Sequence, residues 1–419
     1  MIEGSRGETG VFLALLLGLW IFSPPLAAGE SRVLLMPDYR LDPAQLAVVV
    51  NDSDPLSVRI GAYYREARQL PEKNLIHLNF PPDQGRMSAD AFTPLREQIL
   101  DQTPQRVQAY ALTWTHPYRV DCMSITSAVS FGFDPGWCSA QRCATTRHSP
   151  YYGYTGTTPW KDFKVRPSMV IAADTFEQAK ALIDRGVAAD GTRPPGTAYL
   201  LSTHDKQRNV RAKDYALVRR LMAGWIDTQV IRADTLTDRD DVLFYFTGLT
   251  RVEGLESLGF RPGAVADHLT SAGGVLNGTQ QMSALRWLEA GATGSYGTVV
   301  EPCNHLGKFP APRLLMESYG RGATLIESYW RSVQQPGEGI FIGEPLAAPF
   351  DGASLTSTPT GLHLTTRNLW PGHYRISHSA NPIGPFQELS RFEVLPHQTG
   401  FDLPDRGEGY YRVEPLDSP

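Results

Sequence analysis

Short apolar runs and helical stripes of apolar residues alternate over most of this chain. Between residues 45 and 349, runs of strand length are followed by segments in which apolar residues recur every three or four positions. The runs are typical of strands buried on both faces, and the stripes are typical of helices that cover a sheet. Regular alternation of the two predicts an α/β fold with mostly parallel sheets flanked by helices.

The first unit shows the local signals. Ala47 to Val50 is a continuous apolar run, and Asp54-Pro55 then supplies a helix N-cap and a first-turn proline. Further strands and helices are predicted at 74–80, 88–100, 107–114, 168–172, 176–185, 197–202, 213–223, 228–232, 242–246, 312–319, 323–333 and 339–349.

The pattern changes to a period of two beyond residue 351. GLHLTTRNL, HYRISHS, FQELSRFEVL and GYYRVEPL are short, alternating segments separated by Pro, Gly and Asn. This period is typical of antiparallel strands with one buried face, so residues 351–419 are predicted to form a small β-sandwich. The α/β part divides into a first subdomain at 30–165, which includes a cysteine-containing loop, and a second at 166–350.

The N-terminus carries an export signal. An apolar run from Val11 to Phe22 follows Arg6, breaks at Ser23-Pro24-Pro25 and passes into small residues. This pattern predicts a signal peptide at residues 1–29 and a secreted or periplasmic protein. The run is short for a membrane span of roughly 20 residues, so no membrane span is expected after the signal is removed.

Net charge and sequence motifs limit the classes of partner and cofactor that the chain can be expected to bind. A formal net charge of −5 on 419 residues gives no general attraction to nucleic acid. Gly273-Gly274 is not a phosphate loop, because no Gly-Lys-Ser/Thr follows, and no cofactor is predicted. Lys206, Arg208 and Arg211 form a basic cluster that is interpreted as solvated surface. The oligomeric state stays open.

The four cysteines suggest disulfides in an oxidising compartment. Cys138 and Cys143 lie in one loop within residues 121–165, a segment rich in Gly, Tyr, Trp and Pro, and are predicted to pair locally. Cys122 and Cys303 then remain, and they either bridge to each other or leave Cys303 as a free thiol. The long loop is either a cover over the sheet or a contact for a ligand.

Polar residues follow the buried strands of the second subdomain. Because ligands sit beyond the carboxyl ends of strands in open α/β sheets, these residues are candidates for one site. Arg251 lies in the same loop as Thr247. His116 follows the predicted strand at 107–114, in a polar and aromatic loop. The candidate residues are Thr247, Arg251, Asp267, His268, Glu301, Cys303, His305 and His116.

Several motifs resemble those of the gingipain-type cysteine peptidases, which have a caspase-like fold. The segments are YFTG, GAVADHLTSAGG, GATGSYGT and IFIGEPLA, in the last hundred or so residues of the α/β part. The wider pattern also resembles a family of exported bacterial proteins, which implies no particular activity. Both resemblances imply a caspase-like fold with a β-sandwich behind it.

The chain departs from the peptidase pattern at both catalytic positions. The family places His-Gly at the end of the strand that corresponds to Val242 to Phe246, and a nucleophilic cysteine at the end of the next strand. This chain has Thr247-Gly248 at the first position and Asp267-His268-Leu269-Thr270 at the second. The inherited dyad is therefore absent.

Two hypotheses remain. In one, the chain is a peptidase with a displaced dyad, in which Cys303 is the nucleophile and His268, held by Asp267, is the base. In the other, it is a catalytically silent relative that binds a protein, a peptide or a surface glycan at the same strand ends. On this second view His268 is a buried histidine bonded to a backbone carbonyl, and Cys303 is half of a disulfide. Glu301 and His305 lack a spaced metal motif, so no metal is predicted.

Overall fold

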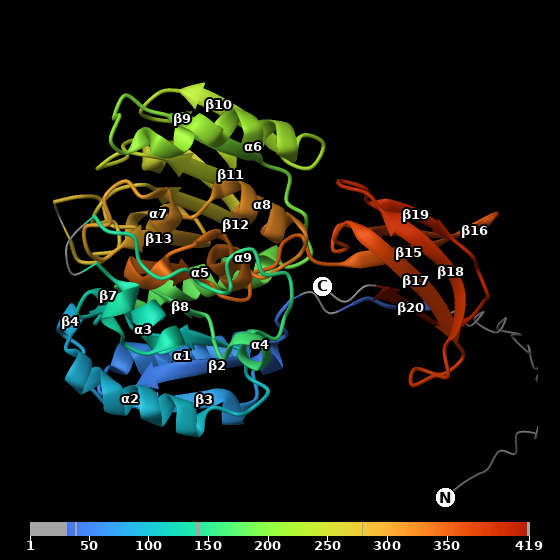
Figure 1. The fold of residues 1–419 in the computed structure, drawn as a ribbon, viewed down its shortest axis with the longest axis horizontal. Coiled ribbons are helices and arrows are strands. Elements are labelled where there is room, and N and C mark those ends of the chain that lie inside the picture. The colour runs from blue at the N-terminus through green and yellow to red at the C-terminus, as the bar shows by residue number, and fades with distance from the viewer. Residues whose placement is uncertain (1–31, 38–39, 140–142, 279, 417–419) are drawn as a thin grey trace, which may run out of the picture.

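The computed structural model describes residues 32–37, 40–139, 143–278 and 280–416, so the predicted signal peptide at 1–29 lies outside the described residues. The chain forms an α/β body and a smaller all-β module beside it (Figure 1). Within the described residues, no helix is both long and apolar enough to cross a membrane.

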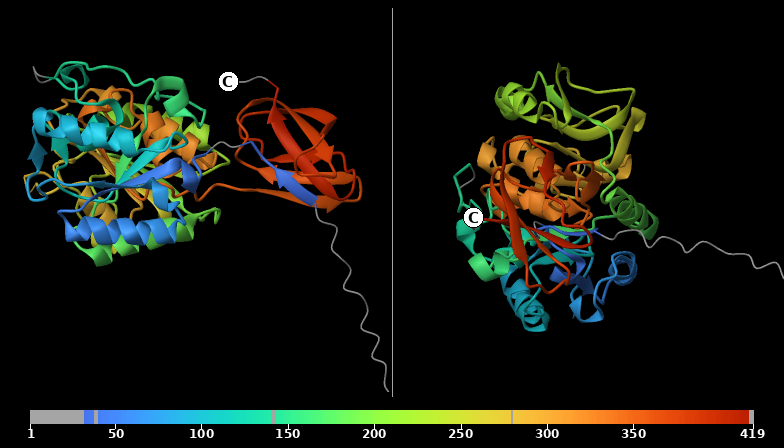
Figure 2. Two further views of the ribbon diagram at one scale, coloured as in Figure 1. Left: turned by 90° about the horizontal axis from the view of Figure 1, so that it is seen from below. Right: turned by 90° about the vertical axis from the view of Figure 1, so that its right-hand side faces the viewer.

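A mixed sheet runs through the α/β body, with ten strands among the described residues. Helices lie on both faces of this sheet (Figure 2), which confirms the predicted α/β class. In spatial order the strands are β10 (Asp227–Arg232), β9 (Thr197–Ser202), β11 (Arg239–Thr247), β12 (Leu258–His268), β13 (Gly294–Thr298), β14 (Gly339–Gly343), β8 (Ser168–Val170), β5 (Ala109–Leu112), β2 (Leu46–Asn51) and β3 (Leu75–Leu78).

The helices begin and end where local signals place them. Asp54 accepts a hydrogen bond from the backbone N–H of Leu56 and caps α1, and Thr175 and Gln178 form a capping box on α5. The helices are α1 (Pro55–Ala67), α2 (Ala89–Gln102), α3 (Ile125–Phe131), α4 (Pro159–Phe163), α5 (Phe176–Ala189), α6 (Tyr215–Met222), α7 (Leu285–Ala290), α8 (Pro312–Gly320) and α9 (Leu325–Ser332).

The two halves of the sheet share one strand order. The chain passes from β2 out to β3 and back across to β5 and β8, and later from β9 out to β10 and back to β11, β12 and β13. Strands within each half pair in parallel. β14 pairs antiparallel with β13 and also bonds to β8, so one sheet spans both halves. Sheets of this kind bind ligands beyond the carboxyl ends of their strands.

Glu344, which follows β14, ties the halves together from within. It is fully buried, and its Oε1 accepts hydrogen bonds from the hydroxyl of Tyr64 at 2.6 Å and from Nε of Arg68 at 3.0 Å. Arg68 also pairs with Asp190 at the end of α5. A buried carboxylate is stable only with such partners, so the GEPL segment has a clear structural role.

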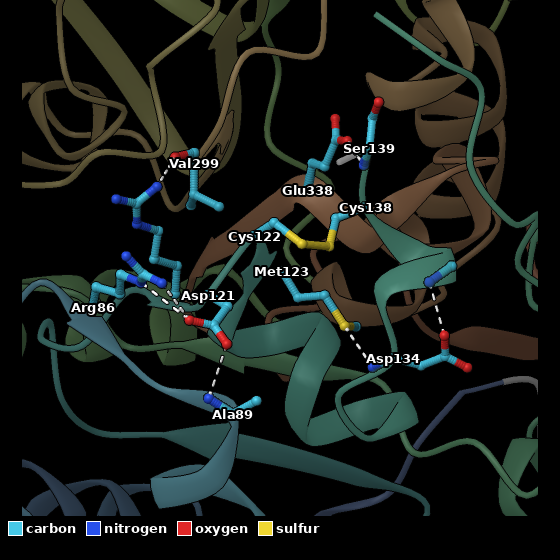
Figure 3. Close-up of a disulfide and its surroundings, with 12 residues drawn as sticks. Arg86, Ala89, Asp121, Cys122, Met123, Asp134, Cys138, Ser139, Val299 and Glu338 are labelled. Atoms are coloured by element: carbon cyan, nitrogen blue, oxygen red, sulfur yellow. Dashed lines mark hydrogen bonds and ion pairs between the residues drawn. A yellow bond between two sulfur atoms is a disulfide. The ribbon is translucent and has the colours of Figure 1, made fainter. Parts of the chain in front are cut away.

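The segment between β5 and β8 is pinned by two disulfides. All four cysteines are among the described residues, and they pair as Cys122 with Cys138 and Cys143 with Cys303. Figure 3 shows the first of these beside the short sheet of β4 (Arg86–Met87), β6 (Arg119–Val120) and β7 (Met123–Ser124). The predicted Cys138 to Cys143 disulfide is therefore wrong, and so is the alternative pairing of Cys122 with Cys303.

The all-β module consists of two small sheets around a common apolar core, in the orders β1-β20-β17-β18 and β15-β16-β19. One strand comes from the opposite end of the chain, because β1 pairs in parallel with β20. The expected first subdomain at 30–165 thus gives its first residues to the C-terminal module. The strands are β1 (Arg32–Leu35), β15 (Ala353–Thr358), β16 (Gly361–Thr366), β17 (Gly372–Ser379), β18 (Gln387–Val394), β19 (Gly400–Leu403) and β20 (Gly409–Pro415).

Candidate functional site

Loops that follow β9, β12 and β13 meet beyond the carboxyl ends of these strands. They enclose a pocket of about 330 Å³, called here the strand-end pocket. Most of its side chains are polar, and they include one guanidinium and one carboxylate. The residues that line it are Gln207, Arg208, Leu269, Thr270, Ser271, Glu301, Cys303 and Asn304.

A buried ion pair lies beneath this pocket. Nη1 of Arg211 is 2.6 Å from Oδ1 of Asp267, and Nη2 donates to the backbone carbonyl of Thr247 at 2.7 Å. The two side chains are only 4% and 2% exposed. Burial raises the pKa of Asp267, although Arg211 opposes the shift. Asp267 therefore belongs to the structural floor of the site and does not reach the pocket.

His268 is fixed in its neutral form. Its Nδ1 accepts a hydrogen bond from Nε1 of Trp287 at 2.9 Å, so its Nε2 carries the proton and donates to the carbonyl of Met282 at 3.1 Å. Burial lowers the pKa of His268 to about 3. Both ring nitrogens are occupied, which matches the interpretation as a buried histidine held by a backbone carbonyl and contradicts a role as a general base.

Cys303 reaches the pocket, but it has no thiol. Its sulfur is bonded to Cys143, and its backbone N–H donates to Oε1 of Glu301 at 2.9 Å. His305 supports this disulfide, because its Nε2 is 2.6 Å from the backbone carbonyl oxygen of Cys143. The predicted nucleophile is therefore wrong, since a disulfide sulfur carries no attacking thiolate.

The remaining sequence candidates lie elsewhere. Thr247 is fully buried under the pocket, and Arg251 lies beyond it in the loop after β11. His116 follows β5 in the first half of the sheet, where burial lowers its pKa against the opposing charges of Asp174 and Asp54. The structure thus brings Glu301 and Cys303 to the pocket, but not Thr247, Arg251, Asp267, His268, His305 or His116.

Arg208 and Arg211 carry much of the site, although the sequence favoured a solvated basic surface. Nε of Arg208 donates to Oγ1 of Thr270 at 3.1 Å, and its Nη1 binds Asp205 at 2.9 Å. The backbone of Arg208 also covers the end of β11, because a Cβ on Gly248 would lie 2.0 Å from its carbonyl oxygen. Their spacing of three residues, just beyond a buried strand, was the available signal for this role.

Comparison with known proteins adds no relative. No protein-family model, curated protein or solved structure matches this chain. Among the described residues, no group of three or more His, Cys, Asp or Glu side chains is arranged to hold a metal ion.

Proposed function

We propose that this chain is an exported binding protein with a caspase-like fold, and that its strand-end pocket binds a segment of another polypeptide. One observation carries the proposal: the groups suited to hydrolysis are sealed, while an open polar pocket remains at the same strand ends. Cys303 is oxidised and His268 is buried, so neither can take part in nucleophilic attack.

The composition of the pocket favours a peptide over a glycan. Glu301 offers a negative charge, Arg208 offers a guanidinium that Asp205 holds in place, and Gln207, Ser271 and Asn304 offer neutral donors and acceptors. This mixture suits the amides and charged groups of a polypeptide. Aromatic side chains, which would stack on a sugar ring, are absent from the described residues that line the pocket. Its volume of about 330 Å³ fits a residue or two of a bound segment.

Two features support export. The N-terminal pattern predicts a signal peptide, and the two disulfides are typical of proteins that fold outside the reducing cytoplasm. A secreted or periplasmic protein meets peptides and unfolded chains, which is consistent with the proposed ligand.

An array of blocked octapeptides, probed with the purified, oxidised protein, tests the proposal. Ser271→Trp would fill the pocket, because Ser271 lines it and an indole is far larger than a hydroxymethyl group. We expect this variant to lose at least tenfold in affinity for the peptides that wild type selects. Ser357→Trp, on exposed β15, is the control and should bind as wild type does. Absence of any selected peptide, or equal binding by Ser271→Trp, would overturn the proposal.

A further inference from the structure

A second, apolar pocket lies beside the strand-end pocket. It has a volume of about 170 Å³, and its walls include Tyr152, Leu217, Leu306 and Pro310. Tyr152 and Leu217 are 39% and 41% exposed, which makes them two of the few large apolar side chains that face solvent among the described residues. Grouped apolar exposure around a cavity marks a place where a partner binds.

The same two segments of the chain line both pockets. Arg208 lines the strand-end pocket and Arg211 lines the apolar one, at the two ends of the first turn of the 3-10 helix η4 (Asn209–Asp214). Across from them, Asn304 lines the first pocket and Leu306 the second. The pockets are therefore neighbours along one stretch of surface, only two or three residues apart along each wall.

The charges around the apolar pocket are largely compensated. Arg211 forms part of its lining, but its guanidinium is paired with buried Asp267. At the rim, Arg313 is 3.2 Å from Glu317, and Asp214 is exposed to water. No uncompensated cation thus remains among the described lining residues to hold an anion, so the cavity suits an apolar group. A cavity of about 150 Å³ can hold a benzene-sized group, so 170 Å³ fits one large apolar side chain.

We propose that the apolar pocket is a second subsite, which binds one apolar side chain of the same polypeptide segment whose polar residue fills the strand-end pocket. This inference rests on the proposed function. An extended chain advances about 3.3 Å per residue, and side chains two positions apart point to the same face. An extended ligand with a polar residue, any residue and then an apolar residue would direct its first and third side chains toward the two pockets.

The test starts from a peptide selected on the array by wild type. Replacing its apolar residue by Gly should weaken binding at least tenfold, whereas Leu and Phe should be accepted. Leu217→Asp should lose this preference and bind the Leu and Gly peptides equally. Leu395→Asp is the matched control, since Leu395 is 54% exposed in the β-module, and it should retain the preference.

Photo-crosslinking gives an independent measurement. A selected peptide with a diazirine analogue of leucine at the apolar position should label the segments around Tyr152, Leu217 or Pro310, mapped by mass spectrometry. Labels elsewhere, or equal preferences in Leu217→Asp and Leu395→Asp, would overturn the second subsite while leaving the strand-end pocket as the binding site. Peptides that bind independently of Ser271→Trp would instead overturn the proposed function.

Discussion

The floor and the rim of the strand-end pocket differ sharply, although both include residues at the end of β12 and in the loop after β9. The floor consists of Asp267, Arg211 and His268. Their side chains are buried, and each forms an ion pair or hydrogen bonds with neighbouring groups. The rim holds Arg208, Glu301 and Ser271, which reach the open pocket. Ionisable residues at strand ends are thus not functional by position alone, because an adjacent loop can seal them into the core.

We expect the floor to determine stability and the rim to determine the proposed binding. Variants of the floor should unfold the protein more easily, whereas variants of the rim should change binding with little effect on stability. The disulfide between Cys143 and Cys303 should affect both stability and binding, because it closes one side of the pocket and links distant parts of the chain.

The largest effect is expected for the disulfides. Cys143 and Cys303 are separated by 160 residues, and removing both by substitution with Ser should cost about 5 kcal/mol by loop-closure entropy. The pair Cys122 and Cys138, with a separation of 16, should cost about 3 kcal/mol in the same model. Urea denaturation of the two double variants measures the difference. A greater loss of stability on removal of the Cys122–Cys138 disulfide would contradict the view that the Cys143–Cys303 disulfide fixes the rim.

Breaking the buried ion pair should have the next largest effect. Arg211→Met leaves Asp267 buried without its cation, which should cost about 3–5 kcal/mol in the free energy of unfolding. Arg211→Met combined with Asp267→Leu removes both charges and should recover much of this loss. If the single variant is as stable as wild type, Asp267 is not the sealed residue described above.

His268 should make stability depend on pH. Its pKa in the folded state, about 3, lies below the ordinary value near 6.5 for an unfolded chain. Stability is therefore complete above about pH 6.5 and falls as the pH drops toward 3, because only the unfolded chain gains the proton. The loss between pH 6.5 and 5 should be about 2 kcal/mol.

Two variants separate this effect from other titrations. His268→Gln is expected to be less stable overall, and its stability should change less between pH 6.5 and 5 than that of wild type. His373→Gln is the control, since His373 is exposed on β17, and it should keep the wild-type slope. Equal slopes in all three proteins would show that His268 is not buried as described.

The smallest effect on stability is expected at the rim. Glu301 is exposed, and Gln at this position can still accept the hydrogen bond from the N–H of Cys303, so Glu301→Gln should change unfolding by less than about 0.5 kcal/mol. Removal of the negative charge should nevertheless weaken the binding of peptides that contain a basic residue several-fold. Calorimetric titration with a selected Lys-containing peptide and its Gln analogue measures the binding, and urea denaturation measures the stability.

Much of the fold could be predicted from local patterns. Ala47 to Val50 and the Asp54-Pro55 cap lie in β2 and at the start of α1, as expected from burial and capping. β1 was missed because a strand of four residues has little periodicity, and its partner β20 lies at the far end of the chain. Edge strands of this kind are determined by tertiary pairing and not by local sequence.

The site was harder to predict than the fold. Disulfide pairing depends on which loops meet in space, and spacing along the chain misassigned Cys138 and Cys143. Burial of His268 depends on Trp287 from α7, and burial of Asp267 depends on Arg211 from the loop after β9. Glu301 lines the pocket because it follows β13, whose end lies at this edge of the sheet.

The strand-end pocket should hold no nucleophilic thiol, and mapping the thiols of the protein measures this. The purified protein, without reduction, would first be treated with an electrophilic peptide probe, then alkylated and digested for mass spectrometry. The structure predicts linked peptides containing Cys122 with Cys138 and Cys143 with Cys303, and no probe on any cysteine. A free Cys303 that carries the probe, with labelling lost in His268→Gln, would show that the pocket does hold a nucleophile.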